Sequence, residues 1–434
     1  MKISQIRHVV LFAFLMAHLF KYFVMYLLKE YIQSALYNIN HNKAYAAFVI
    51  FGTALTFIFT TIVLQITNDI VNNTQPFINA DRLIKLPLNY TDIKGKSIGT
   101  IPSWEIPLLL KETQGYALYS LRDVQYCNLL VNNERYLNST VTYVNSAYWA
   151  INSFDFIAGS PFTEDEVLAK EPVAIVMKNF ADKNFKTNDI IGKKLEVFGI
   201  TYTIKGIVDN YFNIFSGGDQ IWLPYTLNKF VATGINRYEI CVLPNEGIST
   251  NQLKINLVKS IKSHFKNKSI HVDISEKDLF TLKESRIENV GNSMLSYGIP
   301  IILFILLVIP SMNIISISIA NTNNRAKEIA IRKALGATIF ESFILLIIEN
   351  FILVLVGSII GVLSVTTVTS ILIGQILDNS IFESIFIITQ IDYKILIFGI
   401  APLTLLFTLL SGGIPAYLVA KGNIVAILKG GSKC

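Results

Sequence analysis

Four long apolar runs dominate the pattern of hydrophobic and polar positions along this chain. They cover roughly Ala46–Ile66, Tyr297–Ala320, Ser342–Ile373 and Ile395–Leu418. In an α-helix, about 20 residues at about 1.5 Å each cross a hydrocarbon core of about 30 Å. We therefore predict four transmembrane helices. The third run is longer than one span requires and is expected to tilt or to extend beyond the membrane.

The segment between the first two runs has a different pattern. Thr67 to about Asn292 contains Pro, Gly, Asn and Asp between short alternating runs, which predicts mixed α and β structure. Within it, Leu195–Phe212 has two β-rich runs interrupted at Gly199 and Gly206, and we expect a hairpin followed by another strand or turn. The fold class predicted is an α-helical membrane protein with four transmembrane helices and a large α+β domain between the first and second.

Two stretches near the end of this domain are expected to be helical. Thr250–Phe265 carries apolar residues at every fourth position, namely Leu253, Leu257, Ile261 and Phe265. Leu279–Asn292 is polar and charged, and we expect it to continue as a helix into the second span.

Composition agrees with a membrane protein. The chain has 434 residues, of which 52% are hydrophobic and 16% charged, and its mean hydropathy is +0.48. The formal net charge of +6 comes with no long basic stripe and no nucleic-acid-binding motif, so we expect no nucleic-acid partner. Basic residues concentrated in cytoplasmic loops account for the charge more simply.

The positions of lysine and arginine predict the orientation of the spans. Lys29 and Lys43 precede the first run, and Lys421, Lys429 and Lys433 follow the fourth. Four more basic residues follow the second run: Arg325, Lys327, Arg332 and Lys333. Since cytoplasmic loops carry the excess of basic residues, these three segments and both termini are expected in the cytoplasm. The domain between the first two spans is then extracytoplasmic.

The first residues allow more than one interpretation. Val9–Leu28 is an apolar run broken by His18 and Lys21, which could be a fifth span, a signal anchor or an interfacial helix. We favour a helix on the membrane surface, because a fifth span would place the N-terminus outside despite Lys2 and Arg7. Met25 could itself be a start, so residues 1–24 could reflect the choice of start site.

The expected divisions are residues 1–45 for an N-terminal apolar or amphipathic interfacial region, 46–66 for the first span, 67–292 for the extracytoplasmic domain, 293–320 for the second span, 321–338 for a cytoplasmic helix, 339–374 for the third span, 375–394 for an external loop, 395–418 for the fourth span, and 419–434 for a cytoplasmic tail.

The cytoplasmic helix places charged side chains between two membrane runs. Asn321–Asn324 supply candidate N-caps, Glu328 and Arg332 stand at i and i+4, and Gly336 is a plausible stop. Such a helix is expected to lie along the membrane face. It could serve only as a topology signal, or it could receive force from a partner.

The sequence RAKEIAIRKALGAT, Arg325–Thr338, is similar to the cytoplasmic loop of ABC-transporter permeases of the MacB/FtsX-like class, also called type VII. Val144–Glu166 and Ile190–Asn210 resemble the MacB-like periplasmic core domain of that family. Ser411–Gly430 resembles its last span and tail, and Tyr31–Ala46 its amphipathic lead-in. In this order the matches cover nearly everything after about Met25.

The resemblance implies a permease of the bacterial inner membrane that acts as a homodimer or pairs with a related permease. It further implies mechanotransmission, in which closure of cytoplasmic ATPases moves the permease helices and the extracytoplasmic domains. We expect the ATPase, and the ATP, on a separate subunit, because the chain has no G-x-x-x-x-G-K-[ST] phosphate loop. The chain itself is then not an enzyme and binds no cofactor. Further expected partners are a periplasmic adaptor and membrane lipid.

Particular residues follow from the resemblance. The coupling helix that docks on the ATPase would comprise Arg325, Lys327, Glu328, Ile329, Arg332, Lys333, Leu335 and Gly336. Ile329 and Leu335 are the expected apolar contacts, and Glu328 with Arg332 the expected polar ones. Glu349, inside the third run, is expected to tie that span to a basic residue of the coupling helix, with a proton relay as the alternative.

The spans contain further candidate structural positions. Gly357 and Gly361 form a G-x-x-x-G that permits close approach of another helix, or they are a chance pair. Pro310, Pro402 and Pro415 are expected to kink or end helices.

Other chemistry finds little support in the sequence. His264 and His271 have no Cys or carboxylate cluster at metal-ligand spacing, and we expect solvated side chains and no metal. Cys127 and Cys241 could pair in an oxidising compartment or remain free and buried. The sequence therefore predicts an export or extraction permease. The alternative is a relay that transports nothing and regulates an external cell-wall hydrolase.

Overall fold

The computed structural model describes residues 29–37, 39–131, 134–185, 190–211, 220–229, 238–324, 326–376 and 391–421. The chain divides into two compact units. The membrane unit comprises residues 1–64, 300–365 and 392–434, and the external domain comprises residues 65–299 and 366–391.

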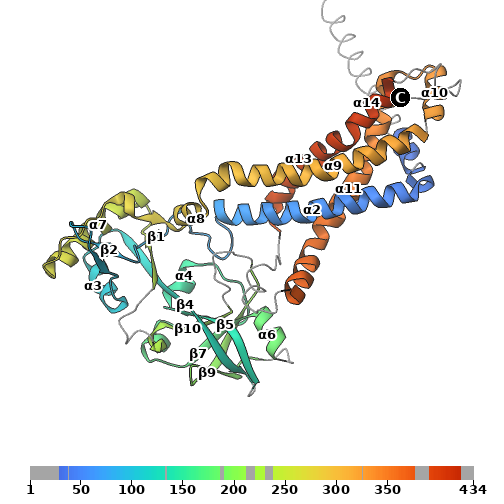
Figure 1. The fold of residues 1–434 in the computed structure, drawn as a ribbon. Helices are drawn as coiled ribbons and strands as arrows, with labels where there is room; N and C mark the ends of the chain where they lie inside the picture. Colours follow the sequence, from blue (N-terminus) through green and yellow to red (C-terminus); the bar gives the residue numbers. More distant parts are fainter. Residues whose placement is uncertain are drawn as a thin grey trace, which may run out of the picture. The chain divides into compact units, whose positions relative to one another are not determined.

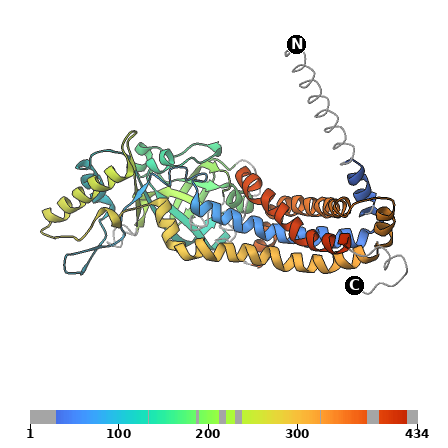
Figure 2. The same cartoon turned by 90° about the horizontal axis from the view of Figure 1, so that it is seen from above.

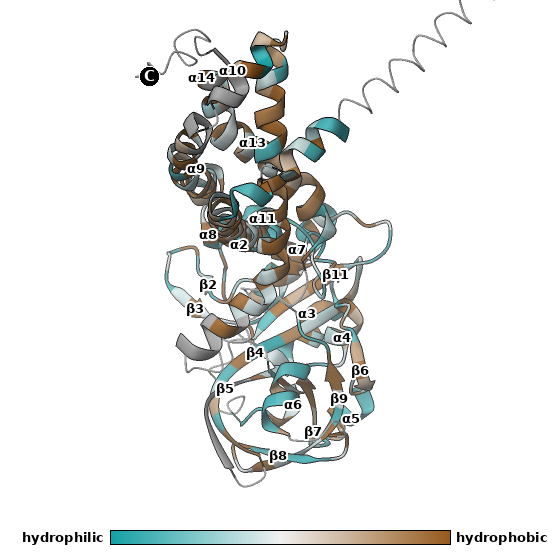
Figure 3. Cartoon of the chain, turned by 90° about the vertical axis from the view of Figure 1, so that its right-hand side faces the viewer, coloured by the Kyte–Doolittle hydropathy of each residue, from teal (hydrophilic) through white to brown (hydrophobic). Residues whose placement is uncertain are grey.

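The four predicted membrane-crossing helices are confirmed. In the described residues, four helices are long and apolar enough to cross a membrane: Lys43–Val71, Met294–Ala320, Ile339–Thr369 and Ile395–Leu418. The long helices α2 (Lys43–Val71), α9 (Ile299–Asn324) and α11 (Ile339–Ile376) form most of the membrane unit (Figures 1 and 2). Hydrophobic residues cover these helices, whereas polar and apolar residues alternate along the external domain (Figure 3).

The fourth span is assembled from short segments. Its order is η6 (Ile395–Ile400), α13 (Ala401–Thr408), η7 (Leu409–Gly413) and α14 (Ile414–Lys421), where η6 and η7 are π-helical. Each π-helical segment ends two residues before a proline, Pro402 or Pro415. A proline ring clashes with the carbonyl four residues earlier, and a wider π-turn displaces that carbonyl.

The second span begins in the same way but tolerates a later proline. The π-helical segment η5 (Met294–Gly298) ends two residues before Pro300. By contrast, α9 continues as an α-helix through Pro310, where the Ser311 hydroxyl donates to the Val308 carbonyl at 2.8 Å. Pro310 therefore does not end the helix, and the alternative expectation of a kink there stays a prediction.

The external domain is built on a mixed sheet. Its strands are β1 (Ile84–Lys85), β4 (Tyr116–Val131), β5 (Glu134–Val144), β6 (Phe156–Gly159), β7 (Val173–Met177), β8 (Lys194–Val197), β9 (Ile200–Val208), β10 (Ile221–Pro224), β11 (Glu239–Pro244) and β12 (Phe280–Thr281), with β2 (Tyr90–Thr91) and β3 (Ser97–Gly99) in a separate ribbon. The order along the main sheet is β12-β1-β11-β4-β5-β10-β7-β9-β6. Because β8 pairs with both β4 and β9, the strands β4, β5, β10, β7, β9 and β8 form a closed ring.

Short helices pack around this sheet. They are α3 (Ile106–Lys111), α4 (Ala147–Ile151), α5 (Glu164–Leu168), α6 (Lys178–Asn184), α7 (Thr250–Asn267) and α8 (Leu282–Val290). The largest core cluster joins the ring to α3 and α7, and the predicted helical face of α7 lies in it, with Leu253, Leu257, Ile261 and Phe265 buried. A second cluster is aromatic and includes Trp149, Phe162 and Trp222.

Two local predictions in this domain hold only in part. The hairpin is confirmed as β8 and β9, joined at Phe198 and Gly199, whose φ values of 50° and 75° fit the tight turn. Gly206 does not interrupt the second strand, however, and lies inside β9 at a register shift against β7. The helix expected to run from 279 into the second span also stops early, because α8 ends at Val290 and is followed by Gly291, whose φ is +84°.

Candidate functional site

The predicted coupling segment forms a helix that is shorter than expected. It is α10 (Ala326–Ala334), and α9 runs on to Asn324 before it. Asn321–Asn324 therefore belong to the last turn of α9, and their expected role as N-caps of the coupling helix is wrong. Arg325 and the side chains of Lys327, Glu328 and Ile329 lie outside the described residues.

The end of α10 is a tight turn into the third span. Gly336 has a φ of +108°, its N–H donates to Lys333 O at 3.0 Å, and the Ala337 N–H donates to Arg332 O at 3.0 Å. These bonds satisfy the last carbonyls of the helix and place a glycine where a side chain would be strained. Gly336 thus ends the turn that follows α10, as its position in the sequence predicts.

A capping box that sequence reasoning missed then starts α11. The Thr338 N–H donates to Glu341 Oε2 at 2.7 Å, and the Glu341 N–H donates to Thr338 Oγ1 at 3.1 Å. The signal was present as a Thr-x-x-Glu pattern directly before an apolar run. The turn and the capping box together hold α10 and the start of α11 in a defined local geometry.

Four large apolar side chains are exposed along this segment. Ile331 is 53% exposed, Leu335 84%, Ile339 57% and Phe340 68%. Ala330, one residue before Ile331, is buried. Ile339 and Phe340 open the third membrane-crossing helix, where exposed apolar side chains are expected, so we call only Ile331 and Leu335 the apolar docking set. Arg332 and Lys333 lie in the same stretch, so the set combines apolar area with positive charge.

The preceding N-terminal helix, residues 29–37, contacts α10. Arg332 Nη2 donates to Ser34 Oγ at 3.2 Å, and Ala35 is fully buried. Burial and the carboxylates of Glu341 and Glu30 raise the pKa of Tyr31, and the smaller lowering effect of Arg332 does not cancel the rise. Burial lowers the pKa of Lys333. The contact between Arg332 and Ser34 joins residues far apart in the sequence, and no local sequence pattern predicted it.

The G-x-x-x-G pair lies against the first span. A Cβ on Gly357 would come within 2.7 Å of Thr53 Cβ and 2.8 Å of Ile50 O. A Cβ on Gly361 would come within 2.6 Å of Ala54 O. Only residues without a side chain permit this approach of α11 to the backbone of α2.

Glu349 and Asn350 are buried in α11, 4% and 3% exposed. Asn350 Nδ2 donates to Thr408 O at 3.2 Å and to Ser411 Oγ at 2.9 Å, which connects α11 with the end of α13 and the π-helical segment η7 of the fourth span. A Cβ on Gly412 would lie 2.5 Å from Asn350 Nδ2. The predicted tie between Glu349 and a basic residue of the coupling helix stays a prediction.

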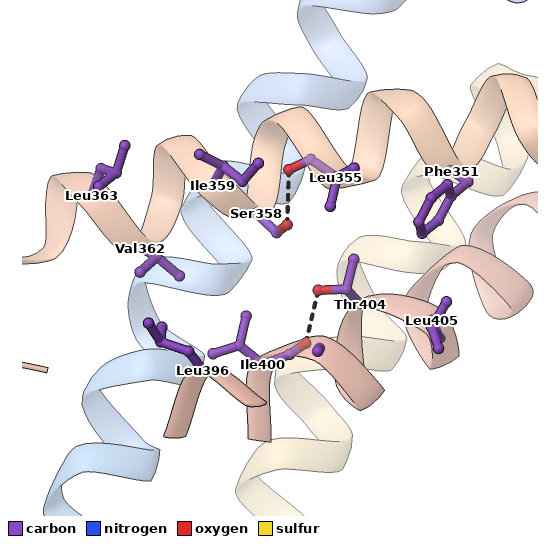
Figure 4. Close-up of a pocket in the computed structure, with 11 residues that line it drawn as sticks. Phe351, Leu355, Ser358, Ile359, Val362, Leu363, Leu396, Ile400, Thr404 and Leu405 are labelled. Atoms are coloured by element: carbon purple, nitrogen blue, oxygen red, sulfur yellow. Dashed lines mark hydrogen bonds between the residues drawn. The ribbon is translucent and has the colours of Figure 1, made fainter. Parts of the chain in front are cut away.

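An apolar groove of about 460 Å³ lies between α11 and the fourth span. Figure 4 shows Leu355, Ile359 and Val362 on one side and Leu396 and Ile400 on the other. The hydroxyls that reach the groove are bound within their own helices, Ser358 to Leu355 O at 2.9 Å and Thr404 to Ile400 O at 2.7 Å. The groove therefore presents apolar surface, which suits the hydrocarbon of a bilayer.

Metal and disulfide chemistry find no support in the described residues. These residues contain no cluster of His, Cys, Asp and Glu that could hold a metal ion. His264 is not solvated as expected, because its Nε2 lies 2.9 Å from Glu105 Oε2. Cys127 and Cys241 are free and buried, and burial raises the pKa of both thiols, that of Cys127 to about 11. Cys241 of β11 pairs with Ser120 of β4. Cys127 lies seven residues farther along β4, or about 23 Å at 3.3 Å per residue, so the two thiols are too far apart for a disulfide.

These observations define a multi-pass membrane protein with a mixed α/β domain between its first two spans. Residues 46–259 match the family model of the MacB-like periplasmic core domain, and residues 300–424 match that of the FtsX-like permease C-terminal domain. The chain therefore belongs to the MacB/FtsX-like permeases of ABC transporters.

Relatives of known name are distant. The macrolide export ATP-binding/permease protein MacB of Haemophilus ducreyi is 25% identical over 48% of this chain and 30% of its own length. The probable syringafactin export ATP-binding/permease protein SyfD of Pseudomonas syringae pv. tomato is 22% identical over 57% of this chain and 37% of its own length. The matches thus span about a third of these relatives. The periplasmic region of MacB from Actinobacillus actinomycetemcomitans covers 49% of this chain and 95% of its own, with 16% identity and a TM-score of 0.37.

Proposed function

We propose that this chain is a permease of the mechanotransmission type, which couples a separate cytoplasmic ATPase to export or extraction of a substrate at the outer face of the inner membrane. The observation that carries the proposal is the apolar docking set, Ile331 and Leu335 at the end of α10, which is exposed beside the basic residues of its last turn. Large apolar side chains exposed together are typical of protein interfaces. Both relatives named above are called ATP-binding/permease proteins, which supports an ATPase as the partner.

The proposed arrangement places both termini and α10 in the cytoplasm, following the basic residues. Two copies of the chain, or this chain and a related permease, would work as a pair. The substrate class stays open, because the relatives' names refer to different exported molecules. The large external domain, which resembles the MacB-like periplasmic core domain, favours export over the relay that regulates a cell-wall hydrolase.

The test begins with purification of the full chain in mild detergent and identification of co-purifying chains. Recovery of an ABC ATPase is expected, and its absence would overturn the proposal. Leu335→Asp should then weaken association with the ATPase by about tenfold or more, as removal of a central apolar contact does at other interfaces. ATPase stimulation by the permease should fall in parallel.

A matched control separates docking from a general effect of the new charge. Leu168 is 62% exposed in α5 of the external domain, so Leu168→Asp adds the same charge far along the chain from α10. This variant should bind and stimulate the ATPase like the unmodified chain. Equal behaviour of the two variants would remove the apolar docking set from the interface.

A further inference from the structure

A buried arginine lies where the chain enters and leaves the external domain. Arg286, on α8, is only 4% exposed. Its Nη1 lies 3.5 Å from the main-chain oxygen of Asp69, near the end of α2, and its guanidinium carbon lies 5.1 Å from the centre of the Phe77 ring. Asp69 is itself fully buried, and Gln65 Nε2 lies 3.5 Å from its Oδ1. The arginine thus contacts both the last turns of α2 and the segment that follows them.

The backbone of α8 is fixed to the same segment. The Leu282 N–H donates to Leu83 O at 2.8 Å, and the Lys283 N–H donates to Ala80 O at 2.9 Å. Just before α8, β12 pairs with β1. The first turn of α8 is therefore held by the stretch of chain that leaves α2.

Side chains reinforce the start of α8. Thr281 and Glu284 form a capping box, with the Glu284 N–H donating to Thr281 Oγ1 at 3.1 Å. Lys254 Nζ, from α7, lies 2.9 Å from Glu284 Oε2. These contacts orient α8 so that Arg286 faces inward.

The charges around Arg286 explain why a buried guanidinium is tolerated. Asp69 and Glu239 are the opposite charges that act on it, and Arg122 is a like charge. Glu239 also pairs with Lys85, whose Nζ lies 2.6 Å from Glu239 Oε2. Burial of Glu239 would raise the pKa of its carboxyl, but Lys85, Arg122 and Arg286 outweigh this effect and hold the pKa low. A buried charge is retained only where such partners offset the free energy that the charge loses when it is removed from water.

We propose that Arg286 is a positioning residue that fastens the outer end of α2 to α8, so that the first span and the helix leading to the second span enter the external domain as one joined element. This inference rests on the proposed mechanotransmission, to which it adds the residue that joins the two connections. Beyond the joint the chain is not continuously α-helical, because it turns at Gly291 and passes through η5 before α9. Movement of the second span relative to α8 would be taken up there and not between α8 and α2.

Spin labels on the two sides of the joint test the inference in the full chain. Asn72 and Glu288 are exposed, and each can be replaced by a labelled cysteine in a Cys434→Ser background, since Cys127 and Cys241 are buried. The unmodified joint should give a narrow distribution of distances. Arg286→Met should broaden it about twofold, because local opening that the contact suppresses becomes populated. Arg286→Lys, which keeps the charge but loses the planar fork, should give an intermediate width.

Controls distinguish a lost joint from general damage. A label pair at Lys111 and Lys262, exposed on α3 and α7, should be unchanged by Arg286→Met, whereas unfolding would broaden it too. Arg82→Met removes another arginine that contacts a main-chain oxygen, that of Pro244 at 3.4 Å, and should leave the 72–288 distribution narrow. If Arg286→Met does not fold, Arg286→Lys carries the same comparison.

A narrow 72–288 distribution in folded Arg286→Met or Arg286→Lys would overturn the inference. That failure is distinct from failure of the proposed function, because the label experiment needs no ATPase and the Leu335→Asp experiment does not involve the joint. With an ATPase bound, Arg286→Met should keep stimulated hydrolysis near that of the unmodified chain. A parallel loss of stimulation would contradict the assignment of Arg286 to a local joint between α2 and α8.

Discussion

The membrane unit and the external domain hold their elements together in different ways. In the membrane unit, α2 and α11 meet through Gly357 and Gly361, and α11 meets the fourth span through neutral hydrogen bonds from Asn350. In the external domain, contacts between distant segments include ion pairs, such as Lys205 with Glu166 and Lys254 with Glu284.

The difference follows from the solvent of each unit. Hydrocarbon gives apolar side chains no reason to prefer one another over lipid, so helices associate through close backbone packing and occasional hydrogen bonds. In water, by contrast, partly exposed charges can pair at little cost. The stability of the membrane unit should therefore fall when side chains are added at these glycines, and it should change little in acid. The stability of the external domain should change with pH through its ion pairs and depend less on such close glycine contacts.

The largest expected effect comes from filling the contact between α2 and α11. Gly361→Leu would place a side chain where even a Cβ would lie 2.6 Å from Ala54 O, so the helices must separate. We expect a loss of about 3 kcal/mol in the free energy of unfolding, at the upper end of the usual cost of overpacking. Far-UV circular dichroism of the purified chain during denaturation in detergent measures it.

Gly52→Leu is the matched control, because Gly52 also lies in a span, but a Cβ there would meet no atom of the described residues within 4 Å. It should leave stability unchanged or slightly raised, since leucine favours helix more than glycine does. An equal loss in both variants would contradict the idea that close approach at Gly361 holds the helices together.

A smaller effect is expected at the contact between α11 and the fourth span. Asn350→Leu keeps a similar volume but removes the bonds to Thr408 O and Ser411 Oγ. Hydrogen bonds between membrane helices contribute modestly, so we expect a loss of about 1–2 kcal/mol for the pair. The same denaturation experiment measures it.

Ser358→Ala serves as the control for this variant. Its hydroxyl donates to Leu355 O within α11, so its loss should cost far less. If Ser358→Ala matched Asn350→Leu, the contact between the two spans would contribute no more than a bond within one helix.

Features that depend on residues close together in the sequence were predictable, whereas contacts between segments far apart in the sequence were not. Apolar length predicted the spans, and the period of four in Thr250–Phe265 predicted α7, because burial of one face fixes both patterns. The close approach at Gly357 and Gly361 was predicted as a possibility. Its partner, α2, required the structure.

The joint at Arg286 shows why the remainder could not be predicted. Its contacts lie 217 residues away at Asp69, and nothing local distinguishes Arg286 from an exposed helical arginine. The π-helical segments before Pro402 and Pro415 are an intermediate case. The prolines signalled a disturbed helix, but proline alone does not decide between a kink, an end and a widened turn.

The smallest expected effect concerns acid and the external domain. Burial would raise the pKa of Glu166, but its bonds to Lys205 and Thr163 outweigh burial and lower the pKa below its usual value of 4.5. A lowered pKa in the folded state stabilises the fold above that usual value, and the contribution is lost as pH falls through the folded pKa. Lys205→Met should therefore cost about 0.5–1 kcal/mol at neutral pH, as partly exposed ion pairs do, and nearly nothing at strongly acid pH. Tryptophan fluorescence follows this unit selectively, because Trp104, Trp149 and Trp222, the chain's three tryptophans, all lie in the external domain.

The control is Lys194→Met, at an exposed position on β8, which should have no such pH-dependent effect. A cost for Lys205→Met that is equally large in acid would mean that the lysine acts by packing and not by charge.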